Sequence, residues 1–468
     1  APPSPSSPTR PKPSPAGWID LSFKKRPKRG AFFRCPAAAG AEIPIFLYFS
    51  PKLWHDERQK LISLRRKGDW KTMRTIGVIS RGIRAPIIRQ GDDLAAIVTE
   101  SILSAAQEGG FAFHDRDVAA VTESVVARAA GNYATTAQIA SDIRAKLGDG
   151  HLGVVFPITS RNRFAIVLRG VAMAAKKITL LLSYPTDEVG NHLFDEELLE
   201  NAGINPYSDV LTEEQYRAAF GYAKHPFTGV DYVEYYKNLI QDCGCEAEVI
   251  FANRAEAILP FTGKILCCDI HTRKRTKKHL LAAGAEKALC LDEVLCAPVD
   301  GSGYNEKYGL LGSNKATEDK IKLFPRDCQA FVDDLAAKLR AATGKNIECM
   351  IYGDGAFKDP VGKIWELADP VVSPACTPGL LGTPNELKIK YLADNDYSGL
   401  QGDALKDAIR DSIRSKDHSL VGEMASQGTT PRQLTDLIGS LCDLTSGSGD
   451  KGTPIVFIQG YFDNYAQD

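Results

Sequence analysis

One carboxylate in the C-terminal half of the chain lies where a strand is expected to end. Asp354 stands between Gly353 and Gly355 and follows the apolar run 347–352. A carboxylate just past a strand end can hold a hard cation, because Mg²⁺ and Mn²⁺ are commonly bound by one or two carboxylates together with nucleotide phosphates. An Asp-Gly turn without a ligand is the competing interpretation. Asp354 is therefore a candidate metal ligand and catalytic residue.

A second candidate is the glycine-rich segment just before the last apolar run of the chain. Closely spaced glycines let backbone N–H groups approach an anion, because no Cβ blocks the way, and Ser, Thr and Lys side chains add donors. The segment predicts a phosphate-binding loop, and a flexible connection is the competing interpretation. It is not a Walker A motif, which needs Gly-Lys-Ser/Thr leading into a helix. Its residues are Ser446, Gly447, Ser448, Gly449, Asp450, Lys451, Gly452 and Thr453.

Three further segments could bind anions. Thr122 ends an apolar run and Arg128 follows it, so a hydroxyl and a guanidinium could contact phosphate. The run 269–278 places a strongly basic helix start after a strand, and a helix N-terminus attracts anions. The turn 160–163, with two arginines, is a weaker candidate of the same kind. For each segment the competing interpretation is an ordinary helix cap or a solvated charged face.

The elements that must position these residues follow a mixed α/β pattern. Strands are expected over 73–79, 118–126, 152–157, 164–169, 178–183, 246–252, 263–269, 288–291, 347–352 and 455–459. Helices are expected over 94–106, 139–147, 231–237, 271–281, 331–343, 404–415 and 430–444. A turn and an N-cap at 91–93 would start the first of these helices. The alternation of strands and helices after residue 246 predicts a small parallel sheet.

Composition limits the class of protein. The chain has 468 residues, enough for two or three domains, with 44% hydrophobic and 25% charged residues as in ordinary globular proteins. A formal net charge of −1 disfavours a general nucleic-acid binder. The eleven cysteines form no CxxC pair, which is typical of reduced thiols in a cytosolic protein. No apolar run reaches the roughly 20 residues that span a bilayer. We expect a cytoplasmic protein that binds neither nucleic acid nor a membrane.

The first 72 residues differ from the rest in composition. Residues 1–15 are dominated by Pro and Ser, residues 24–29 form a basic run, and Met73 then opens the first apolar run. Two interpretations stay open. Residues 1–72 are either a disordered or wrongly translated extension, or they are a targeting peptide or basic binding arm. Few acidic residues fit a transit peptide, but no amphipathic helix or signal-type apolar core is evident.

Five segments, taken in order along the chain, are more specific together than alone. They are residues 82–94, 115–131, 312–327, 351–354 and 443–460. In order and sequence they resemble the coenzyme F420-0:γ-glutamyl ligase family. The first is similar to the family's opening Gly-x-Pro-x-Ile-x-x-Gly-Asp-Asp-Leu, and the others look like its strand–helix unit, its Ser-Asn segment, its second Asp motif and its closing glycine-rich loop.

The resemblance implies an organisation. The chain looks like a long bacterial member of the family with an F420 ligase-like fold of mixed α/β class. Residues 73–150 and 300–468 would form the catalytic domain, and residues 151–299 would be an inserted α/β subdomain. Residues 1–72 would lie outside both. The family resemblance also implies a homodimer.

The resemblance implies an activity as well. GTP would phosphorylate a carboxylate of the acidic acceptor F420-0, and the amine of L-glutamate would attack the acyl phosphate to give a γ-glutamyl amide, GDP and phosphate. A carboxylate is a poor electrophile until one of its oxygens becomes a good leaving group. Catalysis would then consist mainly of positioning, with Mg²⁺ or Mn²⁺ neutralising phosphate charge.

Residue roles carry over from the resemblance by position. Pro86 and Ile87 would line the nucleotide site. Thr122, Arg128 and Asn314 would contact GTP, with Arg128 also counted as catalytic. The loop from Ser446 to Thr453 would wrap the phosphates, and Asp354 would bind the metal.

This chain departs from the family pattern at four positions. Leu311 aligns with a metal-binding Asp of the family, Ser448 with a Gln, Gly355 with a Thr, and Ser124 with a Lys. Leucine cannot ligate a metal, so a two-metal site is not expected without replacement ligands.

Several hypotheses follow from these departures. Asp269 and His271 of the insertion are the first candidates for replacement ligands. An amide ligase of the same fold could use a different acidic acceptor. A nucleotide-binding protein could keep the fold without turnover. The insertion could also bind a phosphate-containing substrate of its own through Arg273 and Arg275.

Overall fold

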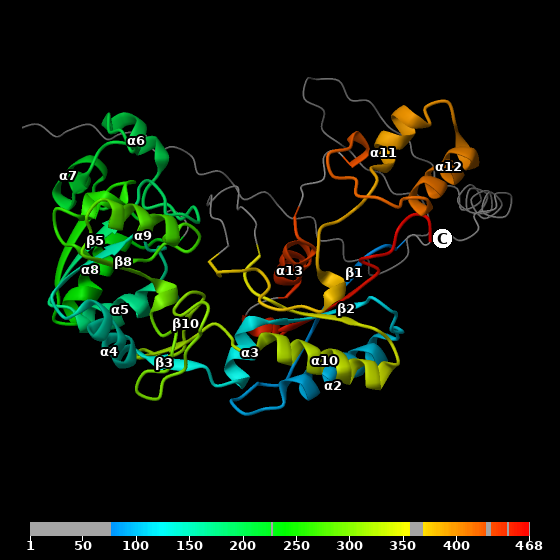
Figure 1. The fold of residues 1–468 in the computed structure, drawn as a ribbon, viewed down its shortest axis with the longest axis horizontal. Coiled ribbons are helices and arrows are strands. Elements are labelled where there is room, and N and C mark those ends of the chain that lie inside the picture. Colours follow the sequence, from blue (N-terminus) through cyan, green and yellow to red (C-terminus); the bar gives the residue numbers. More distant parts are fainter. Residues whose placement is uncertain (1–75, 226–227, 356–367, 427–431, 447–448, 468) are drawn as a thin grey trace, which may run out of the picture. The chain divides into compact units, whose positions relative to one another are not determined.

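The computed structural model describes residues 76–225, 228–355, 368–426, 432–446 and 449–467. The predicted extension over residues 1–72 lies outside this described part. The fold class is mixed α/β, as predicted (Figure 1). Among the described residues, no helix has both the length and the apolar character needed to cross a membrane. Every cysteine of the described part has a free thiol.

The first sheet carries most of the predicted site. It has the strand order β1 (Ile79–Ile83), β13 (Ile455–Gln459), β2 (Val118–Thr122) and β12 (Glu348–Tyr352). β2 and β12 are parallel, and β13 runs antiparallel to both β1 and β2. The carboxyl ends of β1, β2 and β12 therefore meet the amino end of β13 at one edge.

Successive side chains along each strand point to opposite faces of this sheet, and helices pack on both faces. Ala119, Val121, Ile351 and Phe457 face one side, where they pack against α2 (Leu94–Gly109) and α10 (Cys328–Thr343). Their neighbours along the same strands face α13 (Leu434–Thr445). Figure 1 shows α2 and α10 on one face of the sheet and α13 on the other. The sheet is thus buried on both faces, which accounts for its almost unbroken apolar strands.

The predicted start of α2 is confirmed. The helix begins at Leu94, and the side chain of Asp93 accepts a hydrogen bond from the backbone N–H of Ala96 at 3.0 Å. The helix ends at Gly110, whose φ of 63° is the left-handed conformation that glycine adopts without strain.

The second sheet lies within the predicted insertion. Its order is β6 (Leu211–Thr212), β7 (Glu246–Phe251), β5 (Lys177–Leu182), β4 (His151–Val155), β8 (Lys264–Cys267) and β9 (Lys287–Cys290). All pairs are parallel except that of β6 with β7. The chain starts in the middle at β4, builds one side, and then returns to β8. This places a topological switch point between β4 and β8, where such sheets usually bind ligands.

Helices cover both faces of the second sheet. α4 (Thr136–Leu147), α5 (Phe164–Ala174) and α8 (Tyr232–Asp242) share one core with it, and α9 (Arg273–Ala282) packs on the other face. A third, antiparallel sheet joins β10 (Asn314–Lys315), β11 (Lys320–Lys322) and β3 (Tyr133–Thr135). The remaining helices are α3 (Glu123–Ala129), α6 (Glu196–Ala202), α7 (Glu213–Phe220), α11 (Ile389–Tyr391) and α12 (Gly402–Arg414).

Three predicted strands are corrected. The strand expected at 73–79 begins only at Ile79, and the strand expected at 118–126 ends at Thr122, where α3 begins. The strand expected at 164–169 is the first half of α5. Residues 164–168 are all buried and apolar, so the first turn and a half of this helix has no polar position to show a 3.6-residue period. A short apolar run of this kind cannot be distinguished from a strand by pattern alone.

Candidate functional site

The carboxyl edge of the first sheet brings several predicted residues together. Thr122 and Tyr352 are register partners at the ends of β2 and β12, and Asp354 lies two residues further on. The backbone N–H of Thr122 donates to the carbonyl of Pro454 at 3.0 Å. The end of the glycine-rich loop therefore reaches the same edge as Thr122 and Asp354.

Asp354 is paired with an arginine from the insertion. Nη2 of Arg163 lies 2.6 Å from Oδ2 of Asp354, and its Nη1 lies 2.7 Å from Oδ1 of Asp369. Oδ2 of Asp369 in turn accepts the backbone N–H of Asp354 at 2.9 Å. Oδ2 of Asp443, on α13, accepts the backbone N–H of Gly355 at 3.0 Å. Three aspartates and one guanidinium thus surround the end of β12.

The carboxylates of this cluster outnumber its cations. Burial is the main cause that raises the pKa of Asp354 to about 8, and the charge of Asp369 is the second. Glu123 and Asp443 act in the same direction, whereas Arg163 opposes them. Burial also raises the pKa values of Glu123 and Asp443, with further contributions from Asp369. The site therefore lacks positive charge.

Two glycines allow the carboxylates to come this close. A Cβ at position 353 would lie 2.3 Å from Oδ2 of Asp369, and a Cβ at position 355 would lie 2.9 Å from the Cα of Ser440. Neither distance is possible for a real side chain without movement of the backbone or of the carboxylate. The glycines on either side of Asp354 are therefore required by packing, not only by a turn.

A second group of predicted residues gathers around Lys322. Its ammonium group is bonded to Ser124 Oγ and lies 4.0 Å from Oε1 of Glu123. Glu123 also accepts the hydroxyl proton of Thr122 at 2.8 Å. Burial lowers the pKa of Lys322, and the nearby charge of Arg128 acts in the same direction. Lys322 and Arg128 place two cations close together, and such a pair could bind a phosphate.

Asn314 belongs to this second group. It is the register partner of Lys322 in the β10–β11 pair. The structure therefore brings Thr122, Arg128 and Asn314 together, with Lys322 among them. Lys322 lies within a segment that resembles the family, but sequence reasoning gave it no role.

Other predicted nucleotide residues line a separate cavity. Pro86, Lys451 and Thr453 contribute to an open cavity of about 930 Å³ between β1, α2 and the glycine-rich loop. Ile87 is 79% exposed and is not among the lining residues. The carbonyl of Gly452 accepts the backbone N–H of Ala85 at 3.3 Å, which ties the loop to the segment after β1.

The glycine-rich loop itself is partly described. Ser446 caps the end of α13, and Gly449, Asp450 and Lys451 form a short 3₁₀ turn before β13. Gly449 and Gly452 have φ angles of 80° and 63°, so both need glycine. The predicted contacts of Gly447 and Ser448 lie outside the described residues. The loop lies between the Thr122 edge and the cavity, and could reach either.

Within the described part of the chain, no hydrogen bond or ion pair joins Asp269 to Asp354. Oδ2 of Asp269 accepts from the hydroxyls of Thr272 (2.5 Å) and Thr276 (2.8 Å), both close to it in sequence. Among the described residues, the carboxylates acting on Asp354 are Asp369, Asp443 and Glu123. The hypothesis that Asp269 and His271 replace a lost metal ligand is not supported by these contacts.

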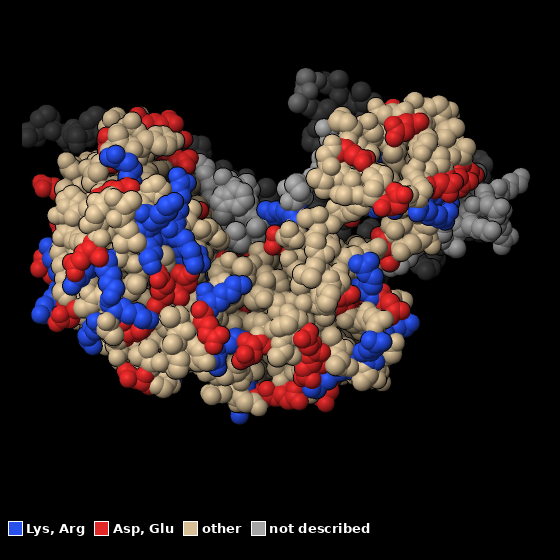
Figure 2. Space-filling model, in the orientation of Figure 1, with Lys and Arg blue, Asp and Glu red and all other residues tan. Residues whose placement is uncertain are grey.

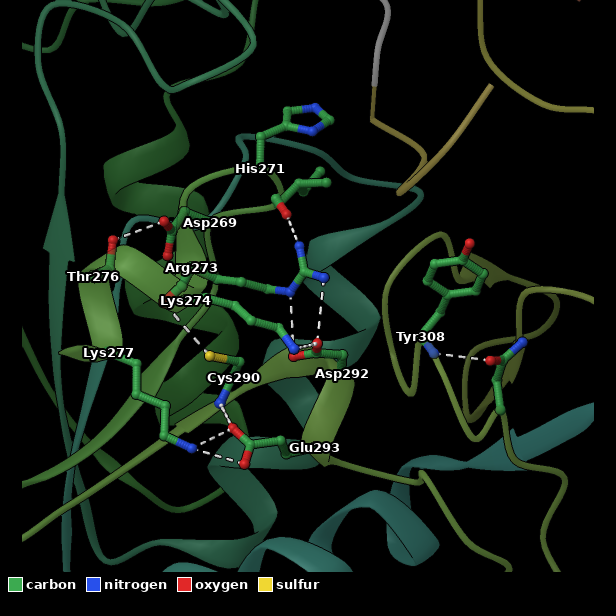
Figure 3. Close-up of polar contacts among 12 residues, drawn as sticks. Asp269, His271, Arg273, Lys274, Thr276, Lys277, Cys290, Asp292, Glu293 and Tyr308 are labelled. Atoms are coloured by element: carbon green, nitrogen blue, oxygen red, sulfur yellow. Dashed lines mark hydrogen bonds and ion pairs between the residues drawn. The ribbon is translucent and has the colours of Figure 1, made fainter. Parts of the chain in front are cut away.

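Three of the basic side chains of α9, those of Arg273, Lys274 and Lys277, are paired within the protein. Lys and Arg side chains gather over α9 on the surface in Figure 2. Figure 3 shows Arg273 and Lys274 directed to Asp292, and Lys277 directed to Glu293. The backbone N–H groups just before the helix are taken by the carboxylate of Glu188. The predicted anion site is therefore already occupied by the protein's own carboxylates.

A possible metal group beside α9 is neutralised in the same way. Ligand atoms of Cys290, Asp292 and Glu293 lie within 4.8 Å of one another. Both carboxylates are paired with the lysines and the arginine of α9 (Figure 3). This group has no excess of negative charge, unlike the cluster around Asp354.

Sequence reasoning missed four charged residues at the main site. Asp369 lies in a bend, Asp443 lies on α13, and the sequence around Glu123 predicts only a helix cap. Arg163 lies in the turn 160–163 that was considered for anions, but its partners are carboxylates of the protein. Only the order of strands, which brings distant segments to one edge, connects these residues with Asp354.

Comparison with known proteins supports the resemblance found in the sequence. Residues 82–460 match the family model described as F420-0:Gamma-glutamyl ligase. No match to the chain is found among curated proteins. The matched range covers most of the chain and includes Asp354, Arg163 and all the carboxylates around them. The chain belongs to the F420-0:gamma-glutamyl ligase family.

Proposed function

We propose that the chain is a GTP- and divalent-metal-dependent ligase that joins L-glutamate to the acidic acceptor F420-0 through an acyl phosphate. Membership of the family supports the ligase class and the γ-glutamyl product. The observation that carries the proposal further is the charge balance at the carboxyl edge of the first sheet. There, an excess of carboxylates lies beside a group of cations suited to phosphate.

A divalent cation fits the carboxylate cluster. Four carboxylates, those of Asp354, Asp369, Asp443 and Glu123, share two nearby cations, Arg163 and Lys322. Burial, followed by the charge of Asp369, raises the pKa of Asp354. Asp354, with Asp443, would hold Mg²⁺ or Mn²⁺, since both ions prefer oxygen ligands. The ion, when bound, neutralises phosphate charge.

The protein's own residues perform the positioning. Arg128 and Lys322 bind the phosphates of GTP, with Asn314 and the hydroxyl of Thr122 beside them. The acceptor carboxylate attacks the γ-phosphorus, the bond to the GDP oxygen breaks, and an acyl phosphate forms. The glutamate amine then attacks the acyl carbon and phosphate leaves. Fixed donors lower the barrier because they need no reorganisation during the reaction.

The test uses the full chain with GTP, Mn²⁺, L-glutamate and F420-0, and follows GDP and glutamylated product by mass spectrometry. We expect one GDP per amide formed. Asp354→Asn should reduce the rate at least about 100-fold, which corresponds to roughly 2.7 kcal/mol of transition-state stabilisation. The matched control is Asp403→Asn, because Asp403 is an exposed aspartate on α12. That control should leave the rate unchanged.

Other outcomes decide between the alternatives. GTP binding without product would favour a nucleotide-binding protein without turnover. Product with another acidic acceptor but not with F420-0 would favour a ligase with a changed acceptor. Absence of both GTP binding and product would contradict the proposal.

A further inference from the structure

We propose that Arg163 is a positioning residue that takes the place of a second cation between Asp354 and Asp369, so that this cluster binds one divalent ion and not two. The inference rests on the proposed function, because that function places the ion at Asp354. The arginine comes from the loop after β4, at the switch point of the second sheet. The insertion would then complete the ligase site with a fixed positive charge.

The contacts of Arg163 already use most of the ligand atoms between the two aspartates. The guanidinium spans Oδ2 of Asp354 and Oδ1 of Asp369 at 2.6 and 2.7 Å. The other oxygen of Asp369 accepts the backbone N–H of Asp354, and the Asp369 side chain is 0% exposed. No hydrogen bond to a described residue reaches Oδ1 of Asp354, whose side chain is 28% exposed. Asp354 therefore keeps one oxygen without a hydrogen bond to a described residue, whereas both oxygens of the fully buried Asp369 already accept one.

The loop that carries Arg163 is held in place from two sides. The hydroxyl of Tyr236, fully buried on α8, accepts the backbone N–H of Ser160 at 2.7 Å. Oγ of Ser160 accepts the backbone N–H of Arg163 at 3.1 Å. The carbonyl of Asn162 accepts the backbone N–H of Lys315 at 2.7 Å. The guanidinium is thus pre-positioned, and its side chain is only 14% exposed.

The cavity beside Arg163 is lined mostly by apolar side chains, and Cys268 and Ser313 are its other possible ligands. Burial holds the pKa of the Cys268 thiol well above its usual value, which disfavours the thiolate that would bind a metal. Leu311 lines the same small cavity as Arg163, together with Phe164 and Ile270. Leu311 is fully buried and has no atom that could bind a metal. A second ion on this side would have to displace a guanidinium that bonds two carboxylates at 2.6 and 2.7 Å.

The test is a Mn²⁺ titration of the full chain, with free Mn²⁺ read from its electron paramagnetic resonance signal. Wild type should bind one Mn²⁺ ion more than Asp354→Asn. The difference between the two stoichiometries assigns that ion to the cluster around Asp354. Arg163→Met removes the charge but keeps the apolar stem. It should bind a second ion, or bind one at least about tenfold more tightly, because the carboxylates lose a cation within a few ångströms.

Two matched variants serve as controls. Arg161→Met removes an exposed arginine two residues away and should behave as wild type. Arg163→Lys loses the guanidinium geometry but keeps the charge, and should stay within about threefold of wild-type affinity because the charge is what excludes the second ion. If Arg163 only held the cluster together, Arg163→Met would bind Mn²⁺ more weakly than wild type, because its carboxylates would be disordered.

Several results would overturn the inference. One is an Arg163→Met affinity and stoichiometry equal to those of Arg161→Met, and another is an Arg163→Lys protein that behaves as Arg163→Met. Two ions at the site in wild type would also overturn it, and that measurement needs no variant to fold. Absence of Mn²⁺ binding in both wild type and Arg163→Met would overturn it together with the metal in the proposed function. If wild type and Arg163→Met bound Mn²⁺ with equal affinity and wild type were an active ligase, only this inference would be overturned.

Discussion

At the scale of single residues, the site depends on unequal numbers of charges. Asp354 has one close cation, Arg163, and that cation is shared with Asp369. Lys322 lies on the Glu123 side of the cluster. A buried carboxylate with too few cations remains protonated or attracts a metal ion. The charge balance of these residues can therefore be tested through the pH dependence of stability as well as through metal binding.

The first residue-scale prediction concerns the pH dependence of stability without metal. The folded pKa of Asp354, about 8, lies above its usual value of 3.8. The unfolded chain therefore binds fewer protons between these values, and Asp354 costs stability as pH rises from about 4 to about 8. Asp354→Asn has no such cost. Relative to wild type, its free energy of unfolding should rise across that window by at least about 1 kcal/mol.

Urea denaturation of both proteins at pH 5 and pH 8, with a chelator present, measures this difference. Asp403→Asn should follow wild type at both pH values, because Asp403 is exposed and pairs only with Lys406. A difference between Asp354→Asn and wild type that does not change with pH would contradict the prediction.

The second residue-scale prediction concerns Gly353. Alanine there would place a Cβ 2.3 Å from Oδ2 of Asp369, so the carboxylate or the backbone must move. Overpacking of this kind typically costs about 1–3 kcal/mol. We expect Gly353→Ala to lower the free energy of unfolding by that amount and to weaken Mn²⁺ binding. Gly399→Ala, where no atom lies within 4 Å of the added Cβ, is the control and should change neither.

At the scale of elements, α8 controls the position of the loop after β4. The hydroxyl of Tyr236 contacts the carbonyls of Ile158 and Ser160 as well as the N–H of Ser160. Tyr236→Phe removes these bonds and leaves buried backbone groups without a partner, at a cost of about 1–3 kcal/mol. Because the same loop carries Arg163, the ligase rate should fall by about tenfold or more.

Thermal unfolding and the ligase assay together check the Tyr236→Phe prediction. The matched control is Tyr235→Phe on the same helix, because Tyr235 is only partly buried. If Tyr236→Phe lost stability but kept the full rate, the link between α8 and Arg163 would be wrong.

Helices and strands could be predicted from the sequence where an N-cap residue marks their start or where apolar and polar segments alternate regularly. Asp93 marked the start of α2, and the alternation after residue 246 indicated a parallel sheet. The strand predicted over residues 164–169 is wrong, because residues 164–168 of α5 are all buried and apolar and no polar position marks the start of the helix. The end of β2 was missed for a similar reason, since Val125 and Val126 continue the apolar run into α3.

Site residues could be predicted from the sequence only where the neighbouring residues in the chain indicate their role. Asp354 between two glycines and Thr122 at a strand end could be identified from neighbouring residues. Asp369 and Asp443 lie on a loop and on a helix, and nothing local distinguishes them from exposed aspartates. Asp369 reaches Asp354 across 15 residues, and Asp443 reaches Gly355 across 88 residues, and only the fold makes these contacts. The same holds for Arg163, which lies 191 residues from Asp354 in the chain.

At the scale of the whole molecule, the free strand edges determine what else can bind. β12 is one edge of the first sheet, and the segment around Cys376 covers it through hydrogen bonds to Cys349 and Ile351. β1 is the other edge, and no described strand pairs with its outer side. Uncovered edges favour pairing with another chain.

The last prediction is therefore the oligomeric state. The homodimer implied by the family resemblance would cover the β1 edge, and the exposed Ile76 and Val78 just before β1 would add apolar contact. Light scattering after size exclusion should give about twice the 50.9 kDa of one chain. Replacing both Ile76 and Val78 with Lys should shift the mass towards one chain, because like charges would then face each other across a two-fold axis. The control replaces the exposed Val421 and Met424 with Lys, which should leave the mass unchanged. A single-chain mass for wild type at micromolar concentration would contradict the dimer and would mean that another segment or partner covers β1.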